Sequence, residues 1–216
     1  MNLLTLVPSL PLVGFLILFL LGRRLSPRAI SYIGVGSVGL AAFVTAFITL
    51  DFQQMSITSH QQVLWHWFSL GETQIGFSLY LDALSLTMMS VVTGVGFLIH
   101  WYAAAYMFED ADLGRFFAYM NLFVCAMLLL VLADNLVLLY LGWEGVGLCS
   151  FLLIGFWYQK PENAAAAKKA FIVTRIGDTS MLIGLLLLFS HLQQLQIQPL
   201  LILVKANWQQ DPDLVW

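Results

Sequence analysis

The sequence predicts an all-α polytopic membrane protein with about six transmembrane helices. Of its 216 residues, 60% are hydrophobic and 10% are charged, whereas ordinary soluble domains carry about 25% charged residues. Such a small charged fraction indicates that lipid is the main solvent of the chain. The chain also contains six apolar stretches, each close to the roughly 20 helical residues that cross a bilayer.

The predicted spans are separated by short polar connections. They cover residues 2–22, 29–50, 82–107, 115–132, 134–156 and 164–190. The first span does not have the pattern of a cleavable signal peptide, because no basic residue precedes its apolar run. Arg23 and Arg24 also follow it without a small-residue cleavage site, so it is expected to stay as a helix.

The basic residues predict the orientation of these spans. Seven of the nine Lys and Arg residues, all except Arg175 and Lys205, lie in or beside the connections after the first, third and fifth spans. The connections on the other side, residues 51–81 and the short one near Asp134, carry none. Because basic residues concentrate in cytoplasmic loops, we expect the N-terminus and residues 51–81 to face outward.

Residues 51–81 are too polar to cross a membrane. Two runs rich in β-branched and aromatic residues, 63–68 and 74–79, flank the turn sequence Gly71-Glu72-Thr73. This pattern is typical of a β-hairpin. A short hairpin on the outer surface is therefore predicted.

Several polar residues near the span ends have structural interpretations. Asp82 precedes the third span, and Asp134 and Asn135 precede the fifth, so helix capping accounts for them. Asn163, which follows Pro161, is expected to cap the sixth span. Asn121 in the fourth span is expected to form a hydrogen bond between helices.

The sequence contains no pattern that would hold a redox cofactor or a metal. There is no phosphate-binding glycine loop, CxxC motif or hydrolase triad. His60 and His66 have no further ligand residues near them, and Cys125 and Cys149 lie in apolar spans, where single cysteines are usually small packing residues. We therefore expect no cofactor and no metal in this chain.

Glu144 is the most informative residue, because it lies near the middle of the fifth span. An ionised side chain there costs roughly 2.5–3.5 kcal/mol on insertion scales, so it needs a partner, water or a proton. Gly147 lies on the same helix face and would let a neighbouring helix or water approach. Two interpretations remain, a proton carrier or a structural partner for a cation from another span.

The sixth span carries a second group of charges. Arg175 and Asp178 are three residues apart and can pair on one face. Lys168 lies two turns earlier on that face, so the three residues form a polar stripe from the basic end to the middle of the span. They could move protons, or the pair could only fix helix packing. Lys168 and Lys169 could equally be interfacial anchors.

His100, in the third span, has two equally supported interpretations. An imidazole can exchange a proton near neutral pH, which would make it a point of proton access. It could also be a hydrogen-bonded packing residue.

Four segments carry a resemblance to a known family. They are Gly114–Phe123, Leu132–Asn135, Gly142–Tyr158 and Ala170–Asp178. They resemble subunit L of bacterial NADH-quinone oxidoreductase (respiratory complex I), the counterpart of mitochondrial subunit 5.

This resemblance implies a proton-pumping, antiporter-like subunit at the distal end of the membrane arm. Glu144 matches the family's helix-five glutamate, and Arg175 and Asp178 match charges of helix six. The redox groups (FMN, iron–sulfur clusters and quinone) would lie in partner subunits of the bacterial inner membrane complex. Family members are more than twice as long, and their seventh helix carries a lysine that pairs with the glutamate. This chain is therefore expected to be a fragment, a truncated product or a split subunit, with the cation that partners Glu144 beyond its end.

The expected organisation follows from these assignments. Residues 1–107 would form the first three helices with the outer hairpin, 108–190 the start of the proton-translocating domain, and 191–216 a polar tail. Two other functions remain open. The chain could belong to the large subunit of a multi-subunit sodium/proton antiporter, or it could be an assembly subunit that pumps nothing. Partners would be other membrane-arm subunits and lipid, with no role for nucleic acid.

Overall fold

The fold is mostly helical with one small two-stranded antiparallel sheet, as the sequence predicts. The computed structural model describes residues 3–55, 58–70 and 73–210. Six of its helices are long and apolar enough to cross a membrane. Their bounds are α1 Leu6–Leu21, α2 Pro27–Met55, α3 Ala83–Tyr106, α4 Leu113–Val131, α5 Leu136–Ile154 and α6 Pro161–Leu192.

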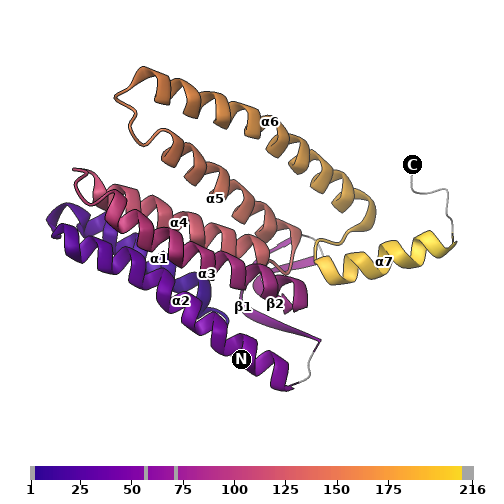
Figure 1. Cartoon of the computed structure of the whole chain (residues 1–216). Helices are drawn as coiled ribbons and strands as arrows, with labels where there is room; N and C mark the ends of the chain where they lie inside the picture. Colours follow the sequence, from indigo (N-terminus) through magenta and orange to yellow (C-terminus); the bar gives the residue numbers. More distant parts are fainter. Residues whose placement is uncertain (1–2, 56–57, 71–72, 211–216) are drawn as a thin grey trace.

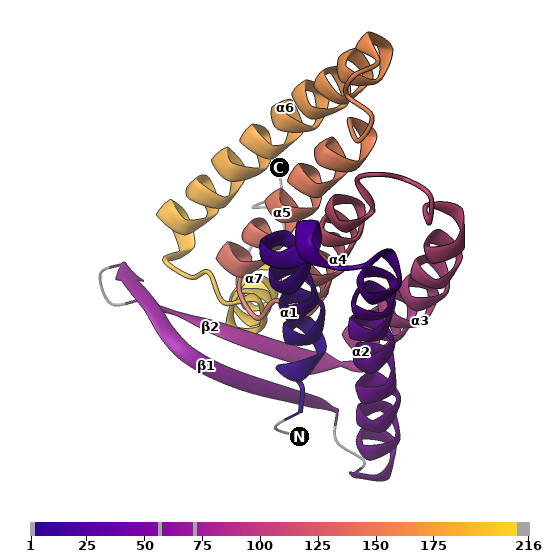
Figure 2. The same cartoon turned by 90° about the vertical axis from the view of Figure 1, so that its left-hand side faces the viewer.

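Helices α1 to α4 form one group, α5 and α6 form a second, and the two groups lie side by side (Figures 1 and 2). Helices α1 to α4 pack together, with α4 in contact with both α1 and α5. Helix α6 packs mainly against α5 and lies on the outside of the bundle. Only Ala167 and Asp178 are buried in α6, so one narrow face of this helix is covered by the described part of the chain.

The predicted hairpin is present across one end of the bundle (Figure 2). Strand β1, Ser59–Leu70, pairs in antiparallel register with β2, Thr73–Asp82, so that Leu70 lies opposite Thr73. Of the predicted turn, Gly71 and Glu72 lie outside the described residues. The side of the membrane on which the hairpin lies stays a prediction.

Asp134, between α4 and α5, attaches this hairpin to the bundle. Its Oδ2 accepts hydrogen bonds from Ser78 Oγ at 2.7 Å and from Gln61 Nε2 at 2.8 Å. The prediction that Asp134 caps α5 is wrong, because hairpin donors occupy its carboxylate. Asn135 alone caps the helix, and its Oδ1 accepts from Leu138 N at 2.9 Å.

The other predicted caps give one agreement and one error. Asp82 forms a capping box with Ser85, whose backbone N–H donates to Asp82 Oδ1 at 2.8 Å. Asn163 does not cap α6, because the helix already begins at Pro161, whose missing N–H suits the first turn. The Asn163 amide donates to the carbonyl oxygen of Trp157 at 3.2 Å instead.

Asn121 joins two helices, as predicted. Its Nδ2 donates to the carbonyl oxygen of Gly34 on α2 at 3.2 Å, and its Oδ1 accepts from Ser37 Oγ on the same helix. Cys125 and Cys149 are both buried free thiols, which agrees with a packing role.

The region predicted as a polar tail contains a helix that the sequence pattern did not reveal. Helix α7, Ile197–Gln210, has 14 residues and is too short to cross a bilayer. Pro199 lies in its first turn, where proline is tolerated. The connection before α7 is bound to the start of α5, because Leu136 N donates to the carbonyl oxygen of Leu195 at 2.9 Å.

Candidate functional site

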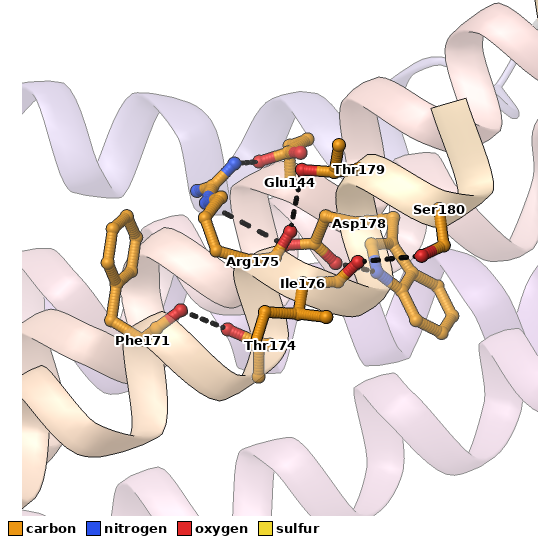
Figure 3. Close-up of polar contacts among 9 residues, drawn as sticks. Glu144, Phe171, Thr174, Arg175, Ile176, Asp178, Thr179 and Ser180 are labelled. Atoms are coloured by element: carbon orange, nitrogen blue, oxygen red, sulfur yellow. Dashed lines mark hydrogen bonds and ion pairs between the residues drawn. The ribbon is translucent and has the colours of Figure 1, made fainter. Parts of the chain in front are cut away.

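The predicted charges of α5 and α6 come together between the two helices (Figure 3). Glu144 is in the middle of α5, and Arg175 and Asp178 are near the middle of α6. Asp178 follows Ala167, the other buried residue of α6, by three turns, so both lie on the face that packs against α5. The polar group therefore lies at mid-span and points inward from α6.

Arg175 and Glu144 form an ion pair across the two helices. Arg175 Nη1 donates to Glu144 Oε2, and the side chains are 37% and 21% exposed, respectively. Within the described chain, α6 thus supplies a cation to Glu144, and the further lysine expected beyond the end of the chain stays a prediction. The sequence shows which charges share one helix, but it does not show that α6 places Arg175 against the middle of α5.

Asp178 lies deeper than the other two charges, at 3% exposure. Its Oδ2 is 3.8 Å from Arg175 Nε, which is ion-pair distance but longer than a hydrogen bond. Its Oδ1 accepts a hydrogen bond of 2.7 Å from the indole Nε1 of Trp143 on α5. The predicted pairing of Arg175 with Asp178 is thus present as the longer of the two contacts that Arg175 makes with carboxylates.

Trp143 is the site residue that sequence reasoning missed. One signal was available, since an indole N–H inside an apolar span needs an acceptor. The residue precedes Glu144 directly, and successive helical side chains point about 100° apart, so the sequence alone did not place both beside α6.

Aromatic contact also helps to hold Arg175 in the site. Its guanidinium carbon is 4.6 Å from the ring centroid of Phe171, one turn earlier on α6, which is a favourable cation–π distance. Arg175 Nε is buried and has no hydrogen-bond partner among the described residues. The Arg175 guanidinium is therefore bound by Glu144 and Phe171, while its Nε, which faces Asp178, has no hydrogen bond to a described residue.

Gly142 and Gly145 allow α5 to approach α4 closely, whereas Gly147, the glycine expected to admit a neighbouring helix or water, does not contact a described helix. A Cβ built on Gly145 would lie 2.9 Å from Ala126 Cβ, and Gly142 is tighter still. A Cβ on Gly147 would meet nothing within 4 Å in the described part of the chain. The space predicted beside Glu144 at Gly147 is present, and no described helix enters it.

Lys168 lines a cavity at the basic end of the bundle. The cavity has a volume of about 270 Å³ between α4, α5 and α6, and Arg115, Tyr119 and Phe151 also line it. Lys168 precedes Arg175 by seven residues, or about 10.5 Å along the helix. Its predicted place on the stripe leading to the mid-span charges is consistent with this position, while Lys169 is exposed outside the cavity.

The imidazole of His100 lies away from the paired charges, on α3. It is 1% exposed, and its Nδ1 is 2.7 Å from the carbonyl oxygen of Gly96. Since a carbonyl only accepts, Nδ1 carries a hydrogen, and Nε2 is left without a partner among the described residues. A packing role and a proton-access role both remain predictions.

Two family models match separate parts of the chain. The model described as "NADH-Ubiquinone oxidoreductase (complex I), chain 5 N-terminus" matches residues 67–117. The model described as "NADH:quinone oxidoreductase/Mrp antiporter, TM" matches residues 133–215, which include the paired charges.

Curated relatives carry a consistent name. NADH-quinone oxidoreductase subunit L of Escherichia coli is 54% identical over 96% of this chain, and that of Pseudomonas aeruginosa is 52% identical over 96%. F(420)H(2) dehydrogenase subunit L of Methanosarcina mazei is 43% identical over 87%. The chain spans 34% of the length of the first two relatives and 27% of the third.

Solved structures share the fold. The Mrp complex of Dietzia sp. matches with a TM-score of 0.78 and 26% identity, over 97% of this chain and 22% of that one. The archaeal membrane-bound sulfane sulfur reductase matches with a TM-score of 0.75 and 16% identity, over 94% and 40%, which shows the fold alone.

The sequence similarities point to the same kind of protein as the structure does, a helical membrane protein with charged residues between α5 and α6. The chain is a multi-pass membrane protein that belongs to the family of NADH-quinone oxidoreductase subunit L, and it matches the N-terminal third of that family's members.

Proposed function

We propose that this chain acts within a proton-translocating membrane-arm subunit of NADH-quinone oxidoreductase in the bacterial inner membrane. The observation that carries the proposal is the ion pair between Glu144 and Arg175 at mid-span, with Asp178 as a second carboxylate beside the same cation. Ionisable residues at membrane depth are costly and usually mark an ion or proton pathway.

In this proposal, Glu144 is the central proton carrier. While Arg175 contacts Glu144, the guanidinium compensates the charge of the carboxylate. If Arg175 moves toward Asp178, Glu144 is left without a cation in apolar surroundings, and binding a proton makes it neutral. Return of Arg175 expels that proton. Quinone reduction elsewhere in the complex would drive the alternation.

Protons would enter from the end of the bundle where the basic residues gather. Arg115 of α4 donates to the carbonyl oxygen of Phe156 after α5 at 3.2 Å, and Gly22 after α1 lies beside Gly114. The connections after α1, α3 and α5 are thus at one end, opposite the hairpin. We propose that this end faces the cytoplasm and that the N-terminus faces outward. Lys168 would admit protons, and His100 would be a second point of access.

The wider assignments belong to this proposal. Residues 1–107 would be an N-terminal unit, residues 108–190 the start of the translocating domain, and residues 191–216 the tail that now includes α7. Other membrane-arm subunits would be direct partners. FMN, iron–sulfur clusters and quinone would be bound by partner subunits, and this chain would contribute to the enzyme without a redox centre of its own.

The test is Glu144→Gln in the assembled oxidoreductase, reconstituted into vesicles. NADH-driven proton uptake, measured per NADH oxidised, should fall by about tenfold or more, as expected for loss of a proton-transferring group. Glu109→Gln changes an exposed carboxylate between α3 and α4 and should leave proton uptake unchanged. Full pumping in Glu144→Gln would refute the assignment of Glu144.

A sodium/proton antiporter is the second candidate, favoured by the match to the Mrp complex. Co-purification with peripheral flavin and iron–sulfur subunits would support the oxidoreductase, and co-purification with small antiporter subunits would support the antiporter. A non-pumping assembly role is the third candidate function. Glu144→Ala would then lower the amount of assembled complex without lowering the proton uptake of each complex formed.

A further inference from the structure

The position of Trp143 shows how two carboxylates share one cation. Asp178 is 3% exposed, yet the Arg175 guanidinium makes its short contact with Glu144. A buried carboxylate without a hydrogen-bond donor is strongly unfavourable. In this site the donor to Asp178 is the indole N–H of Trp143, at 2.7 Å from Oδ1.

The two carboxylates therefore have different partners on opposite helices. Trp143 and Glu144 are neighbours on α5. Trp143 donates to Asp178 of α6, and Glu144 accepts from Arg175 of α6 (Figure 3). The remaining oxygen of Asp178 is 3.8 Å from Arg175 Nε, a nitrogen without a hydrogen-bond partner in the described chain. A displacement of about 1 Å would bring this pair to hydrogen-bond distance, so a small side-chain movement is enough to redirect the cation.

We infer that Trp143 is a positioning residue, whose indole N–H holds Asp178 and thereby sets how Arg175 is divided between Asp178 and Glu144. With the N–H present, Asp178 is partly compensated, and Arg175 is available to Glu144. Without it, Asp178 depends on Arg175 alone and draws the cation away from Glu144. This inference rests on the proposed function, and it adds a residue that acts through Asp178.

The test removes the indole N–H of Trp143 while keeping the shape of the side chain nearly constant. Position 143 is changed to benzothienylalanine, an isostere of tryptophan in which sulfur replaces the N–H, and separately to phenylalanine. Each variant is studied in the assembled, reconstituted oxidoreductase, with NADH-driven proton uptake per NADH oxidised as the readout. We expect both variants to lower this ratio by roughly fivefold to tenfold, because hydrogen bonds to charged groups are among the strong ones.

Combination with Asp178→Asn separates this role from simple packing. If Trp143 acts through the charge of Asp178, Trp143→Phe should cause no further loss in the Asp178→Asn background. The amount of assembled complex, measured on native gels, should be the same for tryptophan and its isostere. Wild-type proton uptake with the isostere, or losses that add in the double variant, would overturn the inference.

The failure of this inference can be told apart from the failure of the proposed function. If Glu144→Gln abolishes pumping but the isostere pumps normally, the role of Trp143 is refuted and the proposed function stands. If Glu144→Gln pumps normally, the proposed function fails and the inference fails with it.

Discussion

Gly142 of α5 lies directly against the backbone of Leu130 of α4. A Cβ built on Gly142 would be 2.7 Å from the Leu130 nitrogen and 2.8 Å from its Cα. Backbone cannot move aside as the end of a side chain can. This contact therefore fixes the distance between α4 and α5, and with it the position of the helix that carries Trp143 and Glu144.

Gly142→Ala and Gly147→Ala form a matched pair that tests this contact. Gly142→Ala should destabilise the protein by about 1–3 kcal/mol, because it overpacks the α4–α5 interface. Gly147→Ala adds its methyl group where nothing lies within 4 Å in the described chain, and it should be neutral or stabilising by up to about 1 kcal/mol, because alanine favours the helix. Thermal unfolding in detergent measures both. Equal effects of the two changes would contradict this account of the interface.

Arg175→Gln should destabilise the protein, because it leaves Glu144 and Asp178 without their cation. The expected cost is about 1–3 kcal/mol, below the roughly 3–5 kcal/mol of a fully buried pair, because the Arg175 side chain is 37% exposed. Unfolding in detergent is again the measurement.

The double variant Arg175→Gln/Glu144→Gln should recover part of this loss, since neutral glutamine at position 144 no longer needs a cation. Arg28→Gln, which removes an exposed guanidinium in the first turn of α2, is the control. Strictly additive effects of the Arg175 and Glu144 changes would show that the ion pair contributes nothing to stability.

Lys168→Gln should slow proton uptake several-fold, because Lys168 lines the cavity at the basic end, two turns from Arg175 on the same face of α6. Lys169→Gln should leave uptake unchanged, because Lys169 is equally exposed but is not part of the cavity lining in the described structure. Uptake by the reconstituted oxidoreductase is measured for both. If the two variants behave alike, Lys168 serves only as an interfacial anchor.

Asp134→Asn should loosen the hairpin from the bundle without disturbing α1–α4. Ser78 and Gln61 both donate to the same oxygen, Oδ2, so asparagine keeps an acceptor for them but loses the negative charge that strengthens both hydrogen bonds. About 1–2 kcal/mol of docking energy should therefore be lost. Hydrogen exchange at the Tyr80 amide, which donates to the Leu132 carbonyl oxygen at 2.8 Å, should accelerate about tenfold or more. Asp51→Asn on α2 is the control, and unchanged protection of Tyr80 in Asp134→Asn would refute the anchoring role.

Much of the fold could be predicted because lipid imposes simple requirements on a chain. Every backbone group in a span must be bonded within the helix, so length and apolarity alone identify spanning helices. The hairpin was also predictable, since its alternating residues and turn are local signals. Helix α7 was missed because its glutamines and Pro199 weaken the apolar pattern, and its connection is bound to α5 by long-range backbone hydrogen bonds.

The sequence by itself determined which residues had to be special. Glu144, Arg175 and Asp178 are charges at membrane depth, and their cost is evident without a structure. Only the tertiary structure decided their partners, because contacts between helices depend on which faces pack together. In the structure, Arg175 pairs with Glu144, and Asp178 accepts a hydrogen bond from the indole of Trp143. Asp134, predicted to cap a helix, instead binds the hairpin.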